Sequence, residues 1–198
     1  MLDVRRLFLM KRTAATSVLL ILFCCSEAAG QFEPERWAKA ERDIPRLSPS
    51  SYTGLPRPIA RFLLRHGYTI PQAYDYKGQH NVVRGRFNND RSTDWAILAS
   101  RDGSSQILVF WSGSPARVTR LRRKPDANFL QSYGGDIIGY SRVISVANRK
   151  DILFWHREFG GPKPPPIRHD GIDDAFSGKA SGIHYFDGKR WHQLQGAD

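Results

Sequence analysis

Two uninterrupted apolar runs constrain the fold more than any other feature of this sequence. They read DWAIL at 94–98 and QILVFW at 106–111, and SRDGSS joins them with Asp102-Gly103 as the turn. Strands without polar alternation are covered on both faces or lie centrally in a sheet. The pair therefore predicts a central hairpin, with Trp95 and Ile97 directed into the core.

The surrounding pattern predicts an α+β fold in which two short N-terminal helices precede a largely antiparallel sheet of about six or seven strands. The helices are expected at 34–46, between Pro34 and Pro45, and at 58–67, where apolar residues recur at helical spacing and Gly67 is the C-terminal stop. ARVTRL is expected to be an edge strand, because its arginines discourage pairing with other chains. Further strands are predicted in NVVRGRF, DIIGYSRVISVA, DILFW and the two arms of GIHYFDGKRWHQLQ around Asp187-Gly188.

Residues 1–30 have the layout of a secretory signal peptide, with basic residues, an apolar run from Ala14 to Cys25, and then small residues. The run is about 12 residues long, whereas a membrane span needs ~20. Met10 is an alternative start, and cleavage is expected after Ala28 or Gly30. Lipoprotein anchoring through Cys24 or Cys25 is the less favoured alternative, because bulky Phe23 precedes them. A single globular domain is predicted over 31–198, in an exported, periplasmic or extracellular protein.

Removal of this segment leaves a cysteine-free and strongly basic chain. Residues 1–30 carry four of the 30 Lys and Arg and two of the 19 Asp and Glu, so 26 basic and 17 acidic residues remain, a net charge of +9. A disulfide framework, a thiol nucleophile and a thiolate metal site are thereby excluded. The charge favours an anionic envelope component or an acidic protein as partner, and export argues against nucleic acid.

The stretch GRFNNDRSTDWAIL at 85–98 spaces Asn88, Asp90 and Asp94 like the oxygen ligands of a calcium loop. With SSQILVFW it resembles one blade hairpin of the FG-GAP/VCBS repeats, over residues 85–111. The resemblance implies calcium binding at four positions, which are Arg86, Asn88, Asp90 and Asp94 here. Arg86 replaces the first ligand with a cation, so we expect no calcium site and a turn in which Arg86 bridges Asp90 and Asp94. No cofactor is predicted.

The whole mature chain also resembles a group of uncharacterised secreted bacterial proteins. The resemblance lies in IPQ, DWAIL, ILVFW, GGPKPPP, GIDDAF and the closing HYFDGKRWHQLQGAD. It implies export and no particular activity.

Residues 164–176, PPPIRHDGIDDAF, hold the densest group of chemically active side chains. His169, Asp170, Asp173 and Asp174 are the candidates for a divalent-metal or acid–base site, held on a loop stiffened by three prolines. The competing interpretation makes Asp173 the N-cap of a one-turn helix, with Asp174 at its positive end.

Two aromatic residues of the last hairpin, Tyr185 and Trp191, are candidates for ligand contact. No nucleophile elbow or phosphate loop is present in the sequence. These observations favour a non-enzymatic exported binding protein. The alternative is a small hydrolase of an envelope polymer, built around His169, Asp170, Asp173 and Asp174.

Overall fold

The computed structural model describes residues 33–88 and 91–197. The chain divides into two compact units, Met1–Lys39 and Ala40–Asp198. The predicted signal peptide lies outside the described residues. The first described element is a helix over residues 33–42, close to the predicted start but shorter than the predicted 34–46. Within it, Trp37 Nε1 donates a hydrogen bond to Glu33, four residues earlier, at 3.2 Å.

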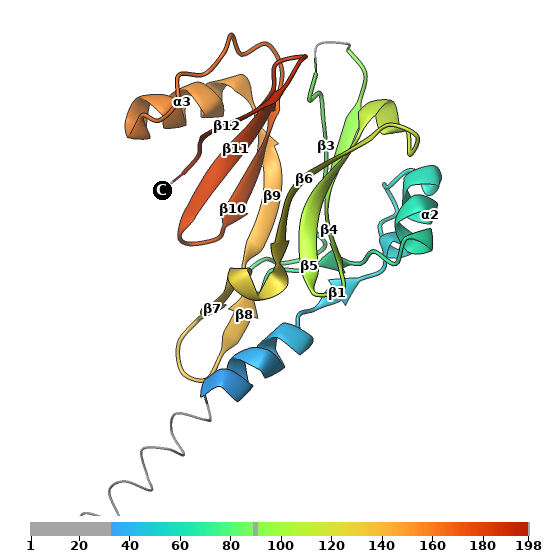
Figure 1. Ribbon diagram of the computed structural model, residues 1–198, viewed down its shortest axis with the longest axis vertical. Coiled ribbons are helices and arrows are strands. Elements are labelled where there is room, and N and C mark those ends of the chain that lie inside the picture. Colours follow the sequence, from blue (N-terminus) through green and yellow to red (C-terminus); the bar gives the residue numbers. More distant parts are fainter. Residues whose placement is uncertain (1–32, 89–90, 198) are drawn as a thin grey trace, which may run out of the picture. The chain divides into compact units, whose positions relative to one another are not determined.

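Two four-stranded antiparallel sheets form the centre of the second unit (Figure 1). The first sheet is a meander in chain order of β3 (Val82–Gly85), β4 (Asp94–Arg101), β5 (Ser104–Phe110) and β6 (Val118–Pro125). The second sheet is also a meander, of β9 (Arg142–Ala147), β10 (Gly171–Phe176), β11 (Ala180–Phe186) and β12 (Trp191–Gln195).

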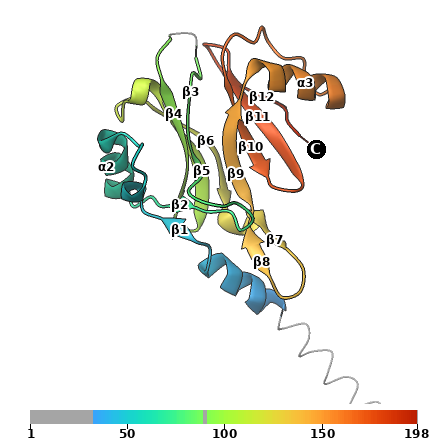
Figure 2. The ribbon, with the colours of Figure 1, turned by 180° about the vertical axis from the view of Figure 1, so that it is seen from behind.

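The two sheets face each other, and one helix covers the outer face of each (Figures 1 and 2). Helix α2 (Arg57–Arg65) lies on the first sheet and α3 (Arg149–Phe159) lies on the second. The smaller elements are two strand pairs and three short 3-10 helices. They are β1 (Arg46–Leu47) with β2 (Ile70–Pro71), β7 (Leu130–Ser132) with β8 (Ile138–Tyr140), η1 (Pro49–Ser51), η2 (Trp111–Gly113) and η3 (Asp126–Phe129).

Each helix seals a separate apolar cluster against its sheet. Ile59 and Leu63 of α2 are fully buried against outward-facing residues of β4 and β5, including Leu108. Ile152 of α3 is buried against Ile183 and Leu194 of the second sheet. The alternate residues of the same strands line the space between the sheets, among them Ala96, Leu98, Ile107, Val109, Ile144 and Ile172. The apolar runs of β4 and β5 are therefore covered on both faces.

Several predicted local features are confirmed. Asp102 and Gly103 both have positive φ and form the tight turn between β4 and β5. The last two strands pair around the Asp187–Arg190 loop. ARVTRL contains the first half of β6, which lies at the edge of its sheet.

The predicted single sheet of six or seven strands is wrong, because the strands divide between two facing sheets and two small pairs. Pro125 and η3 end the first meander, and the second begins at Arg142.

DILFW was predicted as a strand but lies in α3, a third helix. The Asn148 side chain accepts hydrogen bonds from the backbone amides of Lys150 and Asp151. In turn, the Asp151 carboxylate accepts a hydrogen bond from the Asn148 amide. This reciprocal capping box starts a helix, and it outweighs the β propensity of a five-residue apolar run. Within the described residues, no helix is long and apolar enough to span a bilayer.

Candidate functional site

The four acid and histidine candidates of residues 169–174 do not converge on one site. The expected helix at Asp173 is absent, since GIDDAF forms β10 and pairs with strands on both sides. Consecutive residues of a strand face opposite ways, so Asp174 points between the sheets and Asp173 toward the face that α3 covers. Asp170 accepts a hydrogen bond from the Arg86 amide at 3.0 Å. The arrangement required by the hydrolase alternative is not formed by these four side chains.

His169 and Tyr185 form a buried stacked pair with a ring separation of 4.4 Å and an interplanar angle of 9°. His169 Nδ1 lies 2.9 Å from its acceptor, the Asp170 carbonyl, whereas its buried Nε2 contacts no partner among the described residues. The Tyr185 hydroxyl accepts from the Arg168 amide. Tyr185, predicted to contact ligand, is only 1% exposed and belongs to the core, while half-buried Trp191 packs against Trp111.

The calcium-like loop is held by backbone hydrogen bonds to Asp94. Asp94 is fully buried, and its two carboxylate oxygens accept from the amides of Phe87 and Ser112 at 2.9 and 2.8 Å. The proposed Arg86 bridge includes Asp90, which lies outside the described residues, and no ion pair joins Arg86 to Asp94. Over residues 33–88 and 91–197, no group of three or more His, Cys, Asp or Glu side chains is placed to hold a metal ion.

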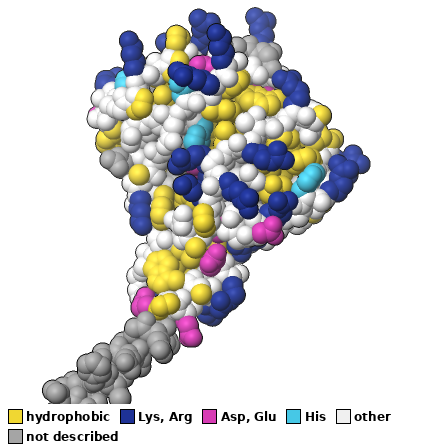
Figure 3. Space-filling model, in the orientation of Figure 1, with side chains coloured by type: hydrophobic (Ala, Val, Ile, Leu, Met, Phe, Trp, Pro, Cys, Tyr) yellow, Lys and Arg dark blue, Asp and Glu magenta, His cyan; other side chains and the backbone are white. Residues whose placement is uncertain are grey.

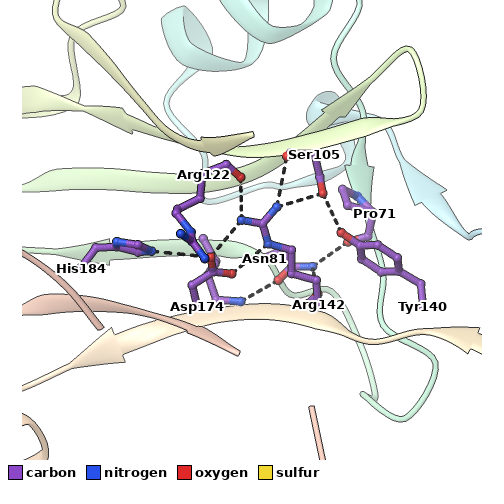
Figure 4. Close-up of polar contacts among 9 residues, drawn as sticks. Pro71, Asn81, Ser105, Arg122, Tyr140, Arg142, Asp174 and His184 are labelled. Carbon is purple, nitrogen blue, oxygen red and sulfur yellow. Dashed lines mark hydrogen bonds and ion pairs between the residues drawn. The ribbon is translucent and has the colours of Figure 1, made fainter. Parts of the chain in front are cut away.

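A buried arginine, Arg142 of β9, forms the polar centre of the space between the sheets (Figure 4). Its Nε and Nη2 donate to both oxygens of Asp174 at 2.8 and 2.9 Å. Its Nη1 donates to the carbonyl and hydroxyl oxygens of Ser105, both at 3.1 Å, and Nη2 also donates to the Arg122 carbonyl at 3.0 Å. All five guanidinium N–H groups are therefore satisfied, and the bonds join β5 and β6 to β9 and β10.

The Arg122 carbonyl reaches Arg142 because β6 contains a bulge. The register between β5 and β6 shifts between Ser105 and Ile107, and Arg122 adopts a positive φ of 54°. An extra residue in one strand turns its carbonyl out of the ladder. Sequence reasoning missed Arg142, although the signal is present: one arginine stands as the single charged residue in the GYSRVISVA part of the predicted strand.

Acid is expected to weaken the fold through Asp174. Burial alone would raise its pKa, but the contacts with His184 and Arg142 prevail and lower the pKa to about 2. A carboxyl whose folded pKa lies below its unfolded value stabilises the fold above pH ~4 and loses that contribution as the pH falls toward 2. We expect a loss of about 2 kcal/mol from this group. Urea unfolding at several pH values between 7 and 2 measures this loss in the free energy of unfolding. The free energy of unfolding of Asp174→Asn should depend less on pH between 4 and 2 than that of wild type. An unchanged pH dependence would contradict the role of Asp174.

The exposed basic residues gather where the edge strands of the two sheets lie side by side. Arg122 Nη1 of β6 donates to Gln193 of β12 at 3.2 Å, and the rings of Trp111 and Trp191 lie 5.7 Å apart, tilted by 33°. Lys and Arg side chains surround this region in Figure 3, and Asp and Glu are fewer. We call this surface the basic edge, and its exposed members are Arg117, Arg120, Arg122, Arg123, Lys124, Lys189 and Arg190.

Few carboxylates neutralise the basic edge. No Asp or Glu occurs between Gly103 and Pro125. Asp126, which follows, is fully buried and paired with Arg46 at 3.0 Å. Asp187 accepts from His192 Nε2 at 2.6 Å and from the Lys189 and Arg190 amides; these bonds hold its pKa well below the usual range.

Comparisons with family models, curated proteins and solved structures gave no match to the chain. The resemblance of residues 85–111 to an FG-GAP/VCBS hairpin therefore stays a prediction.

Proposed function

We propose that this is an exported, non-enzymatic binding protein whose basic edge holds an anionic component of the cell envelope or an acidic protein. The observation that carries the proposal is the run of exposed cations along β6, which no ion pair with a described carboxylate compensates. Adjacent uncompensated cations raise the local positive potential, which attracts anionic partners and speeds their association. The signal-like N-terminus would deliver this surface to the envelope, where anionic polymers are abundant.

Arginine suits this role better than lysine. Four of the five cations between residues 117 and 124 are arginines. Their planar guanidinium groups bind carboxylate, sulfate and phosphate through paired hydrogen bonds. The basic edge would therefore recognise the anionic groups themselves and tolerate variation in the scaffold that carries them.

Replacing Arg120, Arg122 and Arg123 together with glutamine tests the proposal. We expect the chain from residue 31 onward to bind a sulfated oligosaccharide and polyglutamate, and the triple variant to bind each about tenfold more weakly or worse. Isothermal titration calorimetry at two NaCl concentrations provides the affinities, and added salt should weaken wild-type binding.

The matched control replaces three exposed arginines of α2, Arg57, Arg61 and Arg65, with glutamine. This variant has the same net charge as the β6 variant but changes helix α2 and leaves every cation of the basic edge in place. Its affinity should stay within about threefold of wild type, since the cations that bind the probe are unchanged and salt screens the charges of α2. An equal loss in both variants, or no binding of either probe to wild type, would refute the assignment to the basic edge.

A further inference from the structure

The free edge of β6 is a template for another strand. In the described part of the chain, β6 pairs with β5 alone, and it is the last strand of its sheet. In an antiparallel strand, alternate backbone N–H and C=O groups point away from the paired neighbour. These outward groups of β6 are available to an incoming chain, except at Arg122, whose carbonyl bonds to Arg142, and at Pro125, which has no N–H group.

The charge of this edge selects which chain can pair with it. A second copy of β6 would place arginines beside arginines, and like charges on adjacent strands repel. An extended acidic segment would be attracted to this edge, because its carboxylates would lie beside the arginines. At the bulge, Arg122 and Arg123 are consecutive and both exposed, so neighbouring cations are presented at one level of the strand.

We propose that an extended acidic segment of a partner protein adds to β6 as a fifth strand of the first sheet. This inference rests on the proposed function and specifies the partner as protein. Backbone hydrogen bonds would supply the register, and carboxylate–guanidinium pairs would supply the selectivity. An anionic polysaccharide can satisfy the arginines but cannot continue the ladder, because it has no peptide backbone.

The experiment compares three probes on the chain from residue 31 onward. The first is an eight-residue peptide of alternating glutamate and valine, the second is the same peptide with N-methyl groups along both backbone edges, and the third is a sulfated oligosaccharide. We expect N-methylation to weaken binding at least tenfold, since it removes the N–H donors and keeps every charge. Hydrogen exchange should show new protection in β6 with the unmodified peptide and none there with the oligosaccharide.

A charge-reversed pair provides the matched control. Arg120 is exposed on β6. The variant Arg120→Glu should bind the glutamate peptide more weakly than wild type does, and it should bind a lysine peptide of the same pattern more tightly. Strand addition is overturned if the N-methylated peptide binds as well as its parent, or if β6 amides gain no protection. Binding of the oligosaccharide in that case leaves the proposed function standing, whereas failure of all anionic probes overturns both.

Discussion

Replacing Asp174 with alanine is expected to lower the free energy of unfolding by about 3–5 kcal/mol. The change removes two of the five hydrogen bonds of Arg142 and leaves a fully buried guanidinium without its counter-charge. Removing one partner of a buried ion pair costs far more than removing both, because the remaining charge keeps its desolvation penalty. Urea unfolding at pH 7, monitored by tryptophan fluorescence, gives the free energies.

The neighbouring residue provides a matched control for this prediction. Asp173 lies on the same strand but faces away from Arg142; burial raises its pKa, and one of its oxygens has no hydrogen-bond partner among the described residues. Asp173→Ala should therefore change the stability by less than about 1 kcal/mol. Combining Asp174→Leu with Arg142→Met should recover at least half of the loss. Equal effects at Asp173 and Asp174 would show that the ion pair is not what joins the sheets.

Local rules predict much of the first sheet. The Asp102-Gly103 turn depends on two residues that tolerate positive φ, so it could be located from the sequence alone. The edge position of β6 follows from its arginines, because a central strand would bury them. Most of the basic edge was likewise within reach of sequence reasoning, since five of its seven cations lie between residues 117 and 124.

The second sheet depends on contacts that sequence patterns do not encode. GIDDAF becomes a strand because β9 and β11 pair with it on both sides, and this pairing outweighs the capping tendency of Asp173. The partition of the strands into two sheets depends on η3 and Pro125 interrupting the chain. Arg142 contacts residues 20 to 37 positions away in sequence, so its role is visible only after the sheets meet.

Asn81 makes a second set of bonds between the sheets, near Arg142. Its Nδ2 donates to the Pro71 carbonyl at 2.7 Å and the Arg142 carbonyl at 3.3 Å, and its Oδ1 accepts from the Ile144 amide at 3.0 Å. Its own carbonyl accepts from the Leu98 amide at 2.9 Å. Asn81 is 1% exposed and adopts a φ of 68°, a left-handed conformation that asparagine tolerates better than most residues.

We expect Asn81→Ala to destabilise the protein by about 3 kcal/mol or more, because the buried Arg142 carbonyl and Ile144 amide lose their bonds to Asn81 and alanine must adopt a left-handed conformation. The Pro71 carbonyl keeps the hydrogen bond that it accepts from Gln72. Asn81→Gly loses the same side-chain bonds without the conformational strain, so it should be about 1 kcal/mol less destabilising. Urea unfolding of both variants separates the two effects. A loss of less than about 1 kcal/mol in the free energy of unfolding for Asn81→Ala would mean that the Asn81 bonds do not hold β9 to the first sheet. The polar contacts between the two sheets would then depend on Arg142.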